Sequence, residues 1–167
     1  MLVRLTMLLT ALLFVVTSVQ AGEMLRLQEL VNRSDAVAEV TVELSTSRTP
    51  DKITRVKWLT AEPRENFSSQ EWITGQCLPT REIITDNWLA RLPHFSSASL
   101  WRAALDKGRY SAVIFLKKDK EQLRPTCEAE ALLVENWESH PDHARWFSKL
   151  CALIGRSEHL QPGAQCH

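Results

Sequence analysis

Residues 110–116 read Tyr110-Ser111-Ala112-Val113-Ile114-Phe115-Leu116, and this stretch decides the fold that the chain is expected to adopt. It is aromatic, β-branched and apolar on both alternating faces, which is the pattern of a strand covered from both sides. We therefore expect it to be the central strand of a sheet. A charged turn over 117–121 leads to two further expected strands, Gln122–Cys127 and Glu130–Glu135, which would complete a meander.

A hairpin is predicted nearer the N-terminus. Over 38–45 every second residue is apolar, and the polar partners Glu39, Thr41, Glu43 and Ser45 face the other way, which indicates a half-buried strand. A polar, turn-rich link over 46–52 follows. The second strand is expected over Ile53–Thr60, where Val56, Trp58 and Thr60 alternate with Arg55 and Lys57.

Three helices are expected around these strands. The first covers Met24–Asn32, and the second covers Ala98–Lys107, capped by Ser96 or Ser97 and ended by a left-handed Gly108. The third starts near His140 and repeats apolar residues at helical spacing up to Gly155: Phe147, Leu150, Cys151 and Ile154.

The middle of the chain is harder to assign. A short strand is expected over Glu71–Cys77, another over Glu82–Thr85, and a helical turn over Trp88–Leu92. There is no alternation of strands with long helices and no repeat, so a parallel sheet is not expected. We predict an α+β domain with a small antiparallel sheet, curved or partly closed into an OB-like barrel, with flanking short helices and a C-terminal helix.

The first 21 residues have the organisation of a secretory signal peptide. Arg4 supplies a basic start, Leu8–Val16 an apolar core, and Val19-Gln20-Ala21 small residues at a cleavage site. An uncleaved anchor is the alternative, because the uncharged run approaches the length of a spanning helix. We expect cleavage after Ala21, a single globular domain over 22–167, and a periplasmic or secreted location.

The net charge of the chain limits which classes of partner it is expected to bind. Lysine and arginine together number 20, as do aspartate and glutamate, so the formal net charge is zero. A nucleic-acid-binding protein needs a net basic surface, and none is expected here. No membrane association is expected after signal cleavage, and the expected partner is a protein in the periplasm.

The four cysteines, Cys77, Cys127, Cys151 and Cys166, are even in number and follow the expected cleavage site. In an exported protein this favours disulfides over free thiols. Of the three possible pairings we prefer Cys77–Cys127 with Cys151–Cys166, because the second pair would tie a glycine- and proline-containing tail to the last helix. The spacings fit no zinc or haem motif, so no cofactor is expected.

The stretch Trp137-Glu138-Ser139-His140-Pro141-Asp142-His143 looks like a metal or catalytic site. His140, Asp142 and His143 would be its ligands. Histidine ligands on a helix are usually four apart, however, and these two are three apart. Ser139 or His140 as a cap, Pro141 in the first turn and Asp142 at the positive end explain the stretch as a helix start. No catalytic residue is named.

Tryptophan is the other candidate for function, with six in the chain against one tyrosine. Its large apolar ring with one donor suits binding surfaces. Trp72 and Trp88, in polar or irregular surroundings, are expected to be partly exposed and to bind. Trp101 and Trp146, beside apolar neighbours on helices, are expected in the core.

Two stretches carry a resemblance to a known group. Leu30-Val31 with Ser34–Val42, and Gly108-Arg109-Tyr110 with Val113–Leu116, resemble secreted bacterial proteins with an OB-like barrel similar to the module of tissue inhibitors of metalloproteinases and netrins. Val40 stands where such proteins often have glycine. The expected mature end, Gly22-Glu23, lacks the cysteine with which the inhibitors reach a metal, so that mechanism of inhibition is not implied.

Three functions are compatible with these patterns. The preferred one is a non-enzymatic exported module that binds a protein, including inhibitor or toxin-neutralising roles. The second is a small periplasmic hydrolase or metal-dependent enzyme that uses His140, Asp142 and His143. The third is a glycan binder that uses Trp72 or Trp88.

Overall fold

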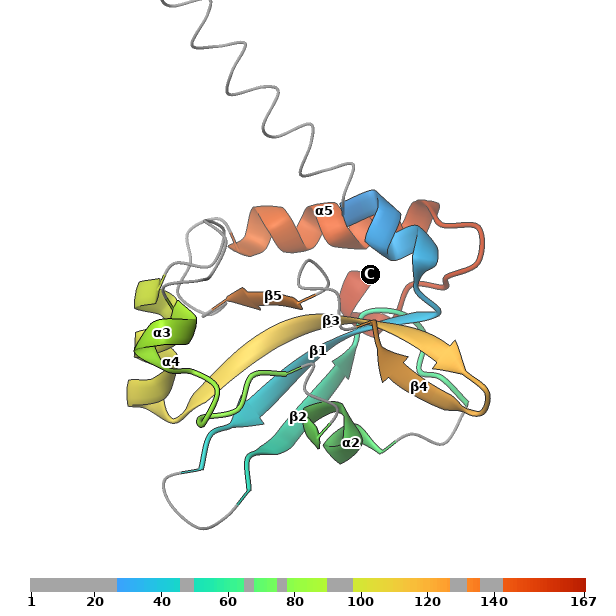
Figure 1. The fold of residues 1–167 in the computed structure, drawn as a ribbon. Helices are drawn as coiled ribbons and strands as arrows, with labels where there is room; N and C mark the ends of the chain where they lie inside the picture. Colours follow the sequence, from blue (N-terminus) through green and yellow to red (C-terminus); the bar gives the residue numbers. More distant parts are fainter. Residues whose placement is uncertain are drawn as a thin grey trace, which may run out of the picture.

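The computed structural model describes residues 27–45, 50–64, 68–74, 78–89, 98–126, 132–135 and 143–167. Its centre is a curled antiparallel sheet in the order β2-β1-β3-β4, with β5 also paired to β3 (Figure 1). The strands are β1 (Ala36–Glu43), β2 (Lys52–Trp58), β3 (Arg109–Asp119), β4 (Gln122–Pro125) and β5 (Leu132–Glu135). Short helices and a C-terminal helix flank this half-barrel, which confirms the α+β class and the partly closed barrel.

β3 is the central strand, as its sequence predicts. One edge of β3 pairs with the whole of β1, from Ala36 opposite Leu116 to Glu43 opposite Arg109. The other edge is shared, because β4 pairs with the end of β3 and β5 pairs with its middle. The predicted meander is therefore wrong in its last step, since β5 returns to β3 instead of pairing with β4. Only the length of β3 makes this possible, as its 11 residues leave room for two partners.

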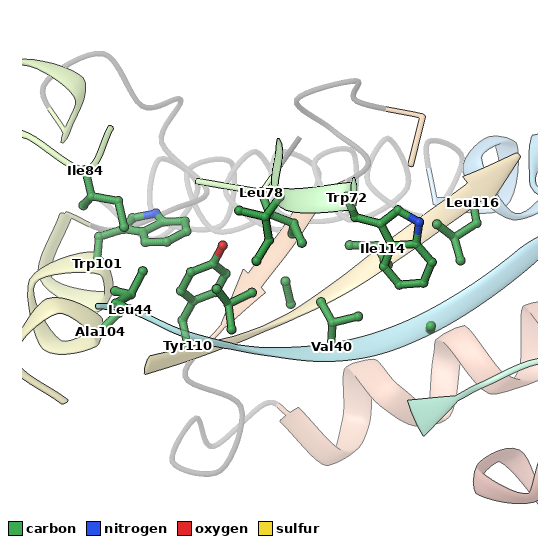
Figure 2. Packing of buried hydrophobic residues seen from close by; sticks show 14 of the residues in the cluster. Val40, Leu44, Trp72, Leu78, Ile84, Trp101, Ala104, Tyr110, Ile114 and Leu116 are labelled. Atoms are coloured by element: carbon green, nitrogen blue, oxygen red, sulfur yellow. The ribbon is translucent and has the colours of Figure 1, made fainter. Parts of the chain in front are cut away.

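The face of the sheet that carries Ala38, Val40 and Val42 is the inner face. It meets a layer made of α2 (Ser69–Thr74), α4 (Ala98–Lys107) and the turn over 78–84. Figure 2 shows the rings of Trp72 and Trp101 above this face, with Ile114 and Leu116 near the first ring and Ala104 near the second. This cluster buries the apolar half of the alternating pattern in β1.

The opposite, outer face is covered over part of its area by a second apolar cluster. Val37, Val113 and Phe115 project from the sheet into it, and none is more than 1 % exposed. The helix over residues 27–33 and α5 (His143–Arg156) lie side by side over this part of the sheet (Figure 1). Both faces of the Val113 region of β3 are thus buried, which explains its unbroken apolar sequence.

The middle of the chain differs from the prediction. Residues 69–74 form helix α2 where a strand was expected, and residues 81–83 form a turn where another strand was expected. A six-residue segment is too short to show a period, and packing of Trp72 and Ile73 on the sheet decides its conformation. The helical turn was expected over Trp88–Leu92 and is present as α3 (Asp86–Leu89).

α4 has the predicted bounds, and Gly108 ends it with a φ of +67°, as expected of a left-handed terminator. α5 ends at Arg156, and its predicted start over 137–142 lies outside the described residues. The chain then runs to a short 3-10 helix, η2 (Ala164–Cys166), where Cys166 forms the predicted disulfide with Cys151. Within the described ranges no helix has the length and hydropathy to cross a membrane.

Candidate functional site

The exposed, polar half of the outer face is the candidate site. It lies beyond the area under α5 and presents the polar half of the β1 alternation, Glu39, Thr41 and Glu43. Strand pairing sets its neighbours, because cross-strand partners point to the same side of a sheet. The set is called the polar face and consists of Glu39, Thr41, Glu43, Lys52, Thr54, Arg55, Lys57, Lys107, Arg109 and Ser111.

A groove of about 610 Å³ is hollowed into this face. A β-bulge helps to form it, because the register of β1 and β2 shifts between Thr41 and Val42. Thr54 and Arg55 therefore both lie opposite Thr41, and Thr54 joins the groove. The groove is lined by side chains from β1 and β2 and by the junction of α4 with β3: Thr41, Glu43, Thr54, Lys107, Gly108 and Arg109.

The polar face is cationic, although the whole chain is neutral. Among the residues whose side chains the structure describes, it holds five lysines and arginines against two glutamates. Lys57 pairs with Glu39 at 3.2 Å, and Lys52 pairs with Glu43 at 3.3 Å. Within the described part of the chain, no ion pair involves the other three cations: Arg55, Lys107 and Arg109. These cations could bind an acidic group. Hydroxyl groups lie beside them, and the Thr41 Oγ1 and Ser111 Oγ are 3.3 Å apart.

A buried polar cluster supports the end of the sheet next to the polar face. Asp51 is 8 % exposed, and its carboxylate accepts the backbone N–H of Ser45 at 2.6 Å and of Arg81 at 2.7 Å. The Tyr110 hydroxyl donates to the Pro79 carbonyl at 2.8 Å. Burial, and secondly the Asp51 carboxylate, raise the pKa of Tyr110 well above its usual value. The phenol therefore stays protonated and serves as a structural donor.

The side chain of Trp72 is buried, whereas the sequence predicted that it is partly exposed. It is 2 % exposed, its Nε1 donates to the Leu123 carbonyl at 2.9 Å, and its ring meets Trp58 edge-on at a centroid distance of 6.4 Å. The prediction of a partly exposed Trp72 is wrong, because the residue lies on α2 and faces the sheet. The side chain of Trp88 lies outside the described residues.

Of the two tryptophans expected in the core, Trp101 is there, and Trp146 is only partly buried. Trp101 is 2 % exposed and packs on Tyr110 with a centroid distance of 5.2 Å, and Trp146 packs against the cluster under α5. Figure 2 shows Tyr110 between the two buried indoles of the inner face, with its hydroxyl pointing to the covering layer.

The metal or catalytic site considered for the histidine stretch is not seen in the described residues. His140 and Asp142 lie outside the described residues, and His143 is the first residue of α5, with a side chain that is not described. No group of three metal-ligating side chains occurs in the described ranges. His159 has a structural role instead, as its ring nitrogens contact the Ser34 carbonyl at 2.8 Å and the Ser157 hydroxyl at 3.0 Å. Cys77 and Cys127 lie outside the described residues.

Sequence reasoning found about half of the residues of the polar face and did not find the face itself. It assigned Arg55 and Lys57 to one side of a strand and Glu39 and Thr41 to one side of another. What brought them together with Arg109 is the pairing of β1 with both β2 and β3. An odd–even pattern shows which residues share a face of one strand, and only the register shows which strands share a face.

No family model, no curated protein and no solved structure matches this chain. The resemblance to the tissue-inhibitor and netrin module stays a prediction.

Proposed function

We propose that this chain is an exported module that binds a protein partner through the polar face. The leader-like sequence over 1–21 and the disulfide between Cys151 and Cys166 support export, because disulfides persist in oxidising compartments. The observation that carries the binding role is the open, cationic groove on a neutral chain. Charge complementarity then calls for an acidic surface on the partner.

The rigidity of the polar face favours binding. β1 is paired with a strand on each edge, so the backbone that carries Thr41 and Glu43 is held from both sides. Arg109 and Ser111 follow directly from Gly108, where the chain turns from α4 into β3. A surface that is already ordered loses little conformational entropy when a partner docks.

Site-specific photo-crosslinking in the cells that produce the chain tests this proposal. A photoreactive amino acid replaces Thr54 in the groove, and in a control it replaces Gln122, which is also exposed but lies on β4. We expect one protein to be captured at Thr54 and not at Gln122. The adduct should disappear when Arg55→Glu and Lys107→Glu are introduced, because both cations belong to the polar face.

Two results would overturn the proposal. One is capture of the same mixture of proteins at both positions. The other is an adduct at Thr54 whose yield does not change when the two charges are reversed.

A further inference from the structure

We infer that the partner of the polar face is bound as an acidic, extended segment that adds a strand to the outer edge of β2. This deepens the proposed function and rests on it. β2 is at the end of the strand order β2-β1-β3-β4, and its other edge is paired with β1. On either side of the bulge at Thr54, every second backbone N–H and C=O of this edge strand points away from the sheet.

The chain itself pairs an extended segment with the residues that directly follow β2. Just beyond β2, the C-terminal tail runs antiparallel to residues 59–61, with a bridge between Thr60 and Pro162. The Gly163 N–H donates to the Leu59 carbonyl at 2.8 Å, and the Ala61 N–H donates to the Gln161 carbonyl at 2.7 Å. The tail thus extends the sheet by one short segment on the side opposite β1.

The tail cannot continue along β2. Directly after Gly163 it turns into η2, and the disulfide holds Cys166 to Cys151 on α5. Within the described ranges no backbone hydrogen bond reaches the outer side of residues 52–57. α2 packs close to β2, and Gln70 Nε2 donates to the Asp51 carbonyl at 3.0 Å just before the strand begins. The tail therefore pairs with the chain just past β2, and the outer edge of β2 itself is left without a backbone partner in the described ranges.

The side chains of β2 specify what the added strand is like. Lys52, Arg55 and Lys57 project to the polar face, and a strand laid beside them would place its own alternate residues on that face. Because Lys52 and Lys57 already pair with Glu43 and Glu39, Arg55 is the cation that an acidic residue of the added strand would meet, at the rim of the groove. Opposite charges across a strand pair stabilise it, whereas like charges destabilise it.

The same residues disfavour a second copy of this chain as the occupant. Two β2 edges paired with one another would bring Lys52, Arg55 and Lys57 against the same three cations. Lysine on an edge strand is a known protection against such self-association. The occupant is therefore a different protein, with carboxylates at every second residue of an extended segment.

The test uses the mature chain and a short synthetic peptide of alternating threonine and glutamate. Binding is measured by fluorescence anisotropy, and hydrogen exchange of the β2 amides is measured with and without the peptide. Two further peptides carry N-methyl groups, one on all the glutamate amides and the other on all the threonine amides. Alternate residues of a strand direct their backbone N–H groups to opposite edges. In the added strand, therefore, either the glutamate N–H groups or the threonine N–H groups point at β2, but not both.

We expect the peptide to slow exchange in β2 and to lose binding through methylation of one set only. Arg55→Glu should weaken binding roughly tenfold, because it replaces attraction by repulsion on the contacted strand. Arg124→Glu is the matched control, an exposed charge reversal on β4, and should leave binding unchanged.

Three outcomes would overturn strand addition. The peptide fails to bind, or both methylated peptides bind as well as the parent, or exchange in β2 is unaffected by a peptide that binds. In each case the crosslinking at Thr54 reports separately on the polar face. A partner captured there, whose adduct depends on Arg55, would leave the proposed function standing without strand addition.

Discussion

Gly163 is the position where one added methyl group should have the largest effect. The residue lies in the tail segment beside residues 59–61 with an ordinary extended backbone, at φ −82° and ψ 173°, so no glycine-specific conformation is required. What requires glycine is space. A Cβ at this position would overlap the Thr60 carbonyl oxygen and lie 2.8 Å from the Trp58 carbonyl oxygen.

The cost of Gly163→Ala follows from these distances. Both contacts are with backbone atoms, which cannot rotate away, so the tail itself must move outward by about 1 Å to reach van der Waals separation. A hydrogen bond of 2.8 Å, such as that from Gly163 to Leu59, does not survive such a shift, and the neighbouring bond from Ala61 to Gln161 is weakened with it. Two weakened hydrogen bonds at about 1 kcal/mol each, together with about 1 kcal/mol or more of overpacking, give a loss of roughly 2–4 kcal/mol.

Urea denaturation followed by tryptophan fluorescence measures this loss as a decrease in the free energy of unfolding. Gly155→Ala is the matched control, because its Cβ would meet only the Pro162 Cγ at an ordinary 3.9 Å and it lies within α5. Alanine in a helix is about 0.5–1 kcal/mol better than glycine, so this variant should be more stable than the parent. A Gly163→Ala protein as stable as the parent, with Gly155→Ala behaving as expected, would refute the close approach of the tail to residues 58–60.

Three further changes test other parts of the fold. Because the pKa of Tyr110 is raised by burial, the unfolded chain loses its phenol proton near pH ~10 while the folded chain keeps it. Stability should therefore be intact below that pH and fall by about 1.4 kcal/mol per pH unit above it, and tyrosinate absorbance of the single tyrosine should rise only as the protein unfolds. Replacing both Cys151 and Cys166 by alanine should lower the free energy of unfolding in urea by about 3 kcal/mol, because the disulfide closes a loop of 15 residues. An unchanged midpoint of unfolding would contradict this. Asp51→Ala leaves the N–H groups of Ser45 and Arg81 without their acceptor, so calorimetry should show a lower melting temperature and a loss of roughly 2–4 kcal/mol.

Local sequence patterns predicted an element correctly where a single local requirement determines its structure. The both-faced apolar run over 110–116 predicts a central strand, and the strict alternation over 38–45 predicts a strand with one polar side. α4 could be bounded to the residue, because serines precede it and Gly108 ends it in the left-handed region. The pairing of Cys151 with Cys166 was also favoured by the sequence, since the tail between them is short and rich in turn-forming residues.

Prediction failed where a long-range contact outweighed the local pattern. Residues 69–74 carry no period of their own, and they are helical because Trp72 and Ile73 pack on the inner face. β5 joins β3 instead of β4, because the free edge of the long β3 is available to it. The exposure of Trp72 was misjudged for the same reason: its polar neighbours in sequence are not its neighbours in space.

The sequence by itself determined an α+β class, the identity of the central strand, the bounds of α4 and the amino acids that point away from the core in β1 and β2. Tertiary structure alone decided that those polar residues meet Lys107 and Arg109 around one groove, and that the C-terminal tail pairs with residues 59–61 just past β2. The physical reason is the range of the forces involved. Side-chain alternation and helix capping act within a few residues, whereas strand register and edge pairing join residues separated by most of the chain.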